Sequence, residues 1–297
     1  MTLTEATTRA IEAPGATLTY DVRPGSSSGA RPLFMIALPM AAAGFGTLAG
    51  HFTDRVVMTY DPRGSERSQK TDPMSSTPPE LHADDLHRLI QELSAGPVDM
   101  FASSGGAIAA LALVERHPDD LRTLVAHEPP LASVLPYREN AMAAARAIHE
   151  TYKRNGWGAG MAHFISVVSH RGEYPEGYAD QPAPDPAMFG MPTEDDGSRT
   201  DPMLGSHMIT STHYEPDFDA LRAAKTRIVM AAGAESEGEM ANRGAYAAAE
   251  KLGTEVVVFP SGHGGFLGGE YGQTGEPDAF ATKLRDVLAE PERGDPS

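Results

Sequence analysis

The stretch that decides the fold is Val98–Ala110, VDMFASSGGAIAA. An apolar run ends in the small residues Ala102–Gly106, and an Ala-rich pattern typical of a helix begins at once. This order predicts a strand, a sharp turn and a helix, with Ser104 at the tip of the turn. The turn would hold the Ser104 hydroxyl above the sheet edge, at a helix N-terminus whose free N–H groups favour negative charge. Taken alone, the stretch also fits a small-residue junction without chemistry.

Composition limits the class of protein. The chain has 297 residues, of which 40% are hydrophobic and 22% charged, so we expect a globular protein with one large domain and an insertion, or two domains. The net charge of −17 makes nucleic acid and anionic membranes poor partners. The chain has no cysteine, which excludes disulfides and cysteine metal sites. It shows no basic and apolar leader and no apolar run near the roughly 20 residues of a membrane span, so we expect a cytoplasmic protein.

Apolar strands alternate with helices along most of the chain. Strands are expected at 16–22, 33–38, 55–60, 98–103, 121–126, 227–232 and 255–259, and helices at 45–52, 79–94, 105–116, 239–252 and 278–288. Continuous apolar strands joined by helices predict an α/β fold with a mostly parallel central sheet and helices on both faces.

The segment 131–219 interrupts this alternation. It begins with an Ala-rich helical sequence and continues into residues dense in Pro, Gly and Asp. Because it lies between two expected core strands, we expect a cap of helices and loops over a core made of 1–130 and 220–297. Its part from 174 to 200 is expected to form long, mobile loops.

A candidate general base follows the last expected strand. His263 lies in FPSGHGGF, and loops that follow parallel strands gather at the sheet edge where Ser104 is expected. A histidine there could accept the proton of the Ser104 hydroxyl. Other histidines are expected on helix surfaces: His51, His82, His87, His117 and His149. Three more lie in the insertion and could line a pocket: His170, His207 and His213.

Four motifs together carry a family resemblance. FASSGGA, YDPRGSERS, AAGAES and FPSGHGG, in this order, resemble the α/β-hydrolase superfamily over nearly the whole chain. The resemblance implies that Ser104 is a nucleophile at a strand–helix elbow and that His263 is its base. It also implies an oxyanion hole built from the N–H of Gly105 and that of Met40 or Ala41.

The acid of the implied triad is less directly marked. The superfamily usually has an Asp after the next-to-last strand, where this chain has Ser236. Some members carry the acid after the strand that follows the elbow helix, which here ends in Glu128 before Pro129 and Pro130. Because a triad is defined by geometry rather than chain order, we favour Glu128 and keep Glu235 as the alternative.

The resemblance implies a serine hydrolase of the carboxylesterase or lactonase type that acts through a covalent acyl-enzyme. Apolar side chains in the insertion and the net charge of −17 favour a neutral or apolar ester, lactone or related acyl compound as substrate. A C–C bond hydrolase or a cofactor-free perhydrolase on the same triad is the alternative, and a non-catalytic ligand-binding protein is a second one. We expect a small-molecule substrate, no cofactor and no metal, and we leave a homodimer open.

Overall fold

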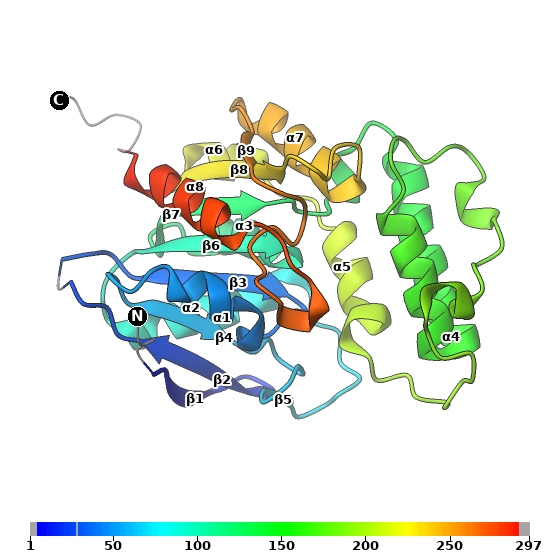
Figure 1. The fold of residues 1–297 in the computed structure, drawn as a ribbon, viewed down its shortest axis with the longest axis horizontal. Helices are drawn as coiled ribbons and strands as arrows, with labels where there is room; N and C mark the ends of the chain where they lie inside the picture. Colours follow the sequence, from blue (N-terminus) through cyan, green and yellow to red (C-terminus); the bar gives the residue numbers. More distant parts are fainter. Residues whose placement is uncertain (1–4, 28, 291–297) are drawn as a thin grey trace.

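The computed structural model describes residues 5–27 and 29–290, which are built around one mixed sheet (Figure 1). The strand order is β1-β2-β4-β3-β6-β7-β8-β9, with β5 paired to β2. Strands β1, β2, β4 and β5 pair in antiparallel fashion through β2, whereas β4, β3, β6, β7, β8 and β9 pair in parallel. The strands are β1 (Thr7–Ala13), β2 (Ala16–Arg23), β3 (Leu33–Leu38), β4 (Val57–Tyr60), β5 (Gln69–Lys70), β6 (Val98–Ser104), β7 (Leu121–His127), β8 (Arg227–Gly233) and β9 (Val257–Phe259).

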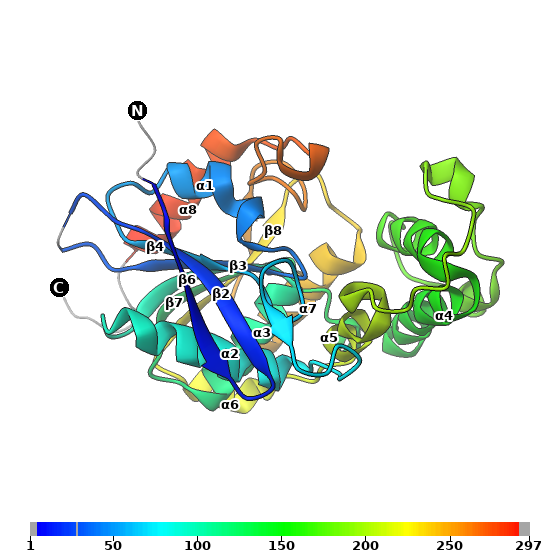
Figure 2. The same ribbon diagram turned by 90° about the horizontal axis from the view of Figure 1, so that it is seen from below.

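Helices cover both faces of the sheet (Figure 2). One face carries α1 (Gly46–Gly50) and α8 (Pro277–Ala289), and the other carries α2 (Pro79–Leu93), α3 (Gly105–Arg116), α6 (Phe218–Ala223) and α7 (Met240–Leu252). Each face has its own cluster of buried apolar side chains. The continuous apolar strands are buried on both sides, as in β3, where all six residues are buried. The expected α/β fold is confirmed; β1 and β5 are strands that the pattern did not predict.

The chain between β7 and β8 leaves the sheet and returns. It contains α4 (Arg138–Val168), a π-helical turn η5 (Met203–His207) and α5 (Met208–Thr212). In Figure 1, α4 lies to one side of the sheet, with α5 between it and the strand ends. These helices share a third apolar cluster, which includes Ile148, Leu204 and Met208. The expected cap boundary at residue 219 falls within α6, which packs against the core through Leu221.

Candidate active site

The turn between β6 and α3 places a serine in a strained conformation. Ser104 has φ 56° and ψ −131°, a region that L-residues rarely adopt. A Cβ on Gly105 would lie 2.9 Å from the carbonyl oxygen of Leu38, and one on Gly106 would lie 2.7 Å from Cα of Ala37. The small residues after Ser104 are therefore required by the close approach of α3 to β3.

Ser103 and Ser104 have different surroundings. Ser103 is 1% exposed, and its hydroxyl bonds to Nδ1 of His127 at 3.0 Å. Ser104 is partly exposed and lines two cavities together with His263. Within residues 5–27 and 29–290, no hydrogen bond links Ser104 to His263; such contacts often tighten only when substrate is bound. Ser104 is thus the serine of the pair that is placed to meet a ligand.

Glu128 and His263 form a close pair. Glu128 follows β7 with φ 47° and is fully buried, and its Oε2 lies 2.6 Å from Nδ1 of the half-exposed His263. Parallel pairing of β7 with β8, and of β8 with β9, brings the two loops to the same sheet edge. The structure therefore brings Glu128 to the imidazole, whereas Glu235 is exposed and accepts a hydrogen bond from Ser261.

The second oxygen of Glu128 is held by donors from the next strand end. Oε1 accepts hydrogen bonds from the N–H of Gly233 at 2.8 Å and from the hydroxyl of Ser236. The amide of Asn242 donates to the same oxygen at 3.4 Å. Burial opposes ionisation, but the bonds from His263 and Ser236 outweigh it and lower the pKa of Glu128 to about 2. Ser236, at the position usual for the acid, instead holds the carboxylate that lies one strand away.

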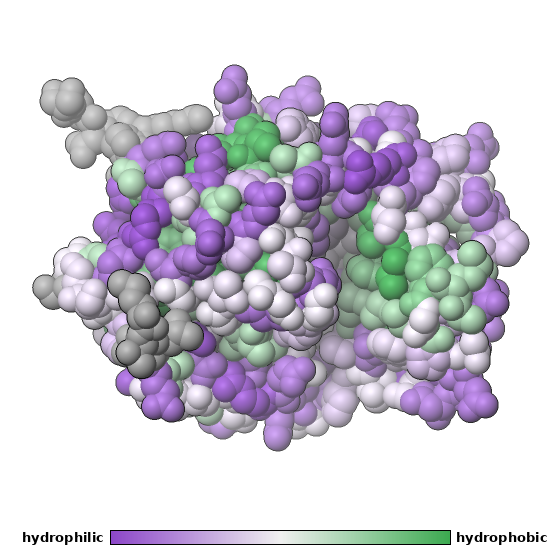
Figure 3. All heavy atoms as spheres, viewed as in Figure 1, coloured by the Kyte–Doolittle hydropathy of each residue, from purple (hydrophilic) through white to green (hydrophobic). Residues whose placement is uncertain are grey.

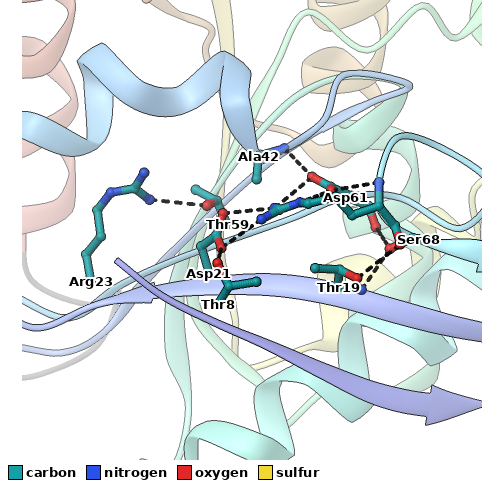
Figure 4. Close-up of polar contacts among 9 residues, drawn as sticks. Thr8, Thr19, Asp21, Arg23, Ala42, Thr59, Asp61 and Ser68 are labelled. Carbon is teal, nitrogen blue, oxygen red and sulfur yellow. Dashed lines mark hydrogen bonds and ion pairs between the residues drawn. The ribbon is translucent and has the colours of Figure 1, made fainter. Parts of the chain in front are cut away.

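The loop after β3 is fixed by a buried carboxylate of the YDPRGSERS segment (Figure 4). Asp61 accepts a hydrogen bond from the N–H of Ala42 at 3.0 Å and from Nε of Arg67 at 2.6 Å. Burial raises the pKa of the Tyr271 phenol, and the nearby backbone of Ala41 opposes this rise. Within the described part of the chain, the N–H of Met40 has no hydrogen-bond partner. Met40 and Ala41 both line a cavity with Ser104.

Two cavities meet at Ser104 and His263. The inner cavity, of about 260 Å³, is mostly apolar; its wall includes Ile148, Phe164, Val167, Met203 and Met208. The outer cavity, of about 660 Å³, is bounded by Met40, Phe266 and Tyr271 as well as by Met161 of α4. The space-filling view shows a hollow between the core and α4, with apolar surface on the α4 side (Figure 3).

Two histidines pack together near the elbow: His82 is not on a helix surface as expected, whereas His207 lines a cavity as the sequence allowed. His82 was expected on a helix surface, but it is 3% exposed and packs edge-on against His207 with ring centroids 5.4 Å apart. His207 lines the inner cavity, and its Nε2 lies 2.6 Å from where a Cβ on Gly105 would be. Burial lowers the pKa of His207 to about 4, so its ring is neutral at pH 7. The sequence placed His207 only in the insertion; its position over the elbow depends on the path of η5.

Three described residues could hold a metal ion. The ligand atoms of His87, His117 and Asp120 lie within 4.8 Å of one another, away from Ser104 at the far end of α3. The two rings are stacked 3.9 Å apart, and Nδ1 of His87 already bonds to Asp120 at 2.7 Å. The sequence missed this cluster because its residues lie on α2 and in the loop after α3. The expected absence of a catalytic metal remains a prediction.

Known proteins similar to this chain share its fold. No protein-family model matches the chain. A Bacillus subtilis (strain 168) protein named "Uncharacterized hydrolase YraK" is 29% identical in an alignment of length 294 that covers 94% of this chain and 94% of that protein. A thermophilic esterase from Thermogutta terrifontis aligns with a TM-score of 0.64 at 17% identity, over 96% of this chain and 98% of its own. A hydrolase from Pseudomonas aeruginosa PA01 aligns with a TM-score of 0.66 at 16% identity, over 96% and 98%.

None of the described helices combines the length and apolar character needed to cross a membrane. Three observations point to the same fold: the order of the strands in the sheet, the serine at the β6–α3 turn and the likeness to these solved structures. The chain therefore has the α/β-hydrolase fold.

Proposed function

We propose that this protein is a serine hydrolase that cleaves a neutral or apolar ester, lactone or related acyl compound. The observation that carries the proposal is the fully buried Glu128, bonded to Nδ1 of His263 at 2.6 Å beside the strained Ser104. A buried carboxylate on an imidazole next to such a serine is the arrangement that nucleophilic catalysis needs. The names of the similar proteins, a hydrolase and an esterase, support the same reaction class.

In this proposal, Ser104 Oγ attacks the carbonyl carbon while Nε2 of His263 takes its proton. Nδ1–H of His263 donates to Glu128, which holds the tautomer with a free Nε2 and stabilises the imidazolium that forms. His263 then protonates the leaving alcohol, and the acyl group remains on Ser104. Water, deprotonated by His263, releases the acid and restores the serine.

The developing oxyanion would be stabilised by two backbone N–H groups. Gly105, the first residue of α3, supplies one at a helix N-terminus. The other would come from Met40 or Ala41, because the N–H of Ala42, the next residue, already donates to Asp61. Asp61 thereby acts as an anchor for the loop that presents Met40 and Ala41.

The apolar inner cavity supports an acyl or alcohol group of hydrocarbon character. Its methionines and aliphatic side chains offer adaptable contacts and few hydrogen-bond partners, so shape and hydrophobicity would select the group that enters.

Replacement of the nucleophile tests the proposal. Ser104→Ala is expected to abolish hydrolysis of short-chain aryl esters and labelling by a fluorophosphonate probe, because one hydroxyl carries the covalent step. Ser103→Ala is the matched control, since Ser103 carries the same group but bonds to the buried His127. Circular dichroism checks that both variants fold. Turnover near the wild-type rate in Ser104→Ala, or labelling mapped to Ser103, would overturn the mechanism.

A further inference from the structure

A third cavity, of about 380 Å³, adjoins the two that meet at Ser104. It shares Leu38, Pro39 and His207 with the inner cavity. With the outer cavity it shares Leu38 and Pro39 together with Ser65, Asp201 and Pro202. A molecule bound at Ser104 can therefore contact residues that also line this third cavity.

The third cavity is rich in cations, although the chain as a whole is acidic. The protein carries 24 Lys and Arg against 41 Asp and Glu. The cavity wall nevertheless has four cationic side chains: Arg63, Lys70, Lys153 and Arg199. Its one carboxylate, Asp201, already accepts hydrogen bonds from Nε1 of Trp157 at 3.0 Å and from the N–H of Leu204 at 2.8 Å.

Three of these cations already have carboxylate partners outside the cavity wall. Arg63 bonds to the buried Asp85, with Nε at 2.7 Å. Lys153 pairs with Glu150 at 3.3 Å, and Arg199 pairs with Asp195 at 2.7 Å. Lys70 is the exception.

The ammonium of Lys70 donates to the backbone carbonyls of Pro73 and Ser75, and within the described residues no carboxylate lies within 4.0 Å of it. An ammonium has three N–H donors, so one donor remains for a ligand. Burial, together with the nearby charge of Arg63, lowers the pKa of Lys70 although the carboxylate of Asp72 opposes this, so the positive charge is only partly compensated.

A second side chain of this cavity wall has a polar atom without a partner. His82 lines the same cavity and is 3% exposed, and its Nδ1 has no hydrogen-bond partner in the described part of the chain. Burial of an unpartnered polar atom costs free energy, so the polar groups in this wall are incompletely satisfied.

We propose that this third cavity is a subsite for a carboxylate carried by the substrate at a distance from the scissile bond, with Lys70 as its counter-ion. One ammonium that is only partly compensated matches one negative charge, which favours a carboxylate over a phosphate dianion. The inference rests on the proposed function and changes its substrate class: the substrate is apolar where it meets Ser104, but it carries an acid at its far end and is not neutral as a whole. Lys70 is then a specificity residue that does not touch the reacting atoms.

The test compares acidic and neutral esters of equal length. One series is p-nitrophenyl esters of dicarboxylic acids of four to ten carbons, against the corresponding alkanoates. A second series carries the acid on the leaving group, as 4-acyloxybenzoates against the methyl esters of those benzoates. The measured quantity is the ratio of kcat/KM for the acidic and neutral members, which cancels any general effect of a variant on folding or chemistry.

In the wild type, we expect this ratio to exceed about 10 at the best chain length of one series, the contribution of a charge-assisted hydrogen bond. Lys70→Gln should return the ratio to about 1. Lys225→Gln, which removes the same charge from a side chain that is 90% exposed, should leave the ratio unchanged. A ratio near or below 1 in both series, or a preference that survives Lys70→Gln, overturns the subsite.

Binding of unreactive analogues separates this inference from the proposed function. Keto acids in which a methylene replaces the ester oxygen are titrated by calorimetry against wild type and Lys70→Gln. The subsite requires binding about tenfold weaker in the variant for the keto acid but not for its neutral methyl ester. Equal binding of the keto acid overturns the subsite, whereas ester turnover that persists in Ser104→Ala overturns only the proposed mechanism.

Discussion

Glu128→Gln is the substitution that probes the proposed triad most directly. The side chains have nearly the same shape, and the site fixes how the amide must lie. Its oxygen has to accept from the N–H of Gly233 and the hydroxyl of Ser236, which donate to Oε1 of Glu128. The NH₂ group then faces Nδ1 of His263, where a carboxylate oxygen lies at 2.6 Å in the wild type.

Two effects set the size of the loss. Lowering the pKa of Glu128 from 4.5 to about 2 corresponds to roughly 3 kcal/mol in favour of the carboxylate at this site, of which the imidazole is the main source. Loss of this charge alone would slow the formation of imidazolium about 100-fold. An amide donor also favours the tautomer of His263 protonated on Nε2, which cannot accept the Ser104 proton. Together, we expect kcat to fall by about 10³- to 10⁴-fold.

The assay is steady-state hydrolysis of a short-chain aryl ester, with KM expected to change little because Glu128 is buried behind His263. Glu235→Gln is the matched control, since Glu235 is exposed and bonds to Ser261. Thermal unfolding of each variant separates loss of fold from loss of chemistry. If Glu128→Gln retains more than a tenth of kcat while Glu235→Gln is crippled, Glu128 is a structural carboxylate and the triad is misassigned.

A second-site change sharpens this test. In Glu128→Ala the space beside Nδ1 of His263 is open, and Ser236 lies where an Asp could extend into it. Adding Ser236→Asp to Glu128→Ala should recover about 100-fold in kcat, because the carboxylate returns from the neighbouring strand end. Equal rates in the single and double variants would contradict the proposed equivalence of the two positions.

Two further predictions concern the fold. Burial lowers the pKa values of His127 and His207 from 6.5 to about 4. Between these pH values the unfolded chain binds more protons than the folded chain, so the folded protein should lose stability as the pH falls from 6.5 to 4. Each histidine accounts for about 3 kcal/mol of this loss in the free energy of unfolding. In His207→Asn, the loss measured by urea unfolding should therefore be smaller by that amount. An unchanged loss contradicts the lowered pKa of His207. Limited proteolysis should cut first in residues 174–200, whose side chains from 181 onward are mostly exposed, and a first cut inside a core helix or strand would oppose the expected mobility.

The alternation of apolar strands and helices was sufficient to predict the core, since buried parallel strands read as continuous apolar runs. β1 was missed because its side chains are mostly exposed on an edge strand, so its sequence lacks such a run. β5 has two residues, too few for any periodicity.

Within the site, Ser104, His263 and Glu128 could be singled out because each lies at the end of a strand that the pattern identifies or in the loop that follows it. Because these strands run parallel, their carboxyl ends bring the three residues to the same edge of the sheet. The contributions of His207, His82 and Lys70 could not be predicted in this way. They depend on how the insertion folds back over the core, and helical periodicity in the insertion does not specify where η5 lies relative to α3.

In the proposed triad, the acid lies at position 128 instead of position 236, without a change in the geometry around His263. Adjacent parallel strands end side by side, so the ends of β7 and β8 lie within one hydrogen bond of each other, as the bond from Gly233 to Glu128 demonstrates. A carboxylate at either end can approach the same face of His263, provided that the other end supplies donors rather than a second negative charge. Ser236 and Asn242 meet this requirement, because both donate to the carboxylate. In the proposed triad, the serine at the usual acid position is explained by a relocated acid and not by a lost one.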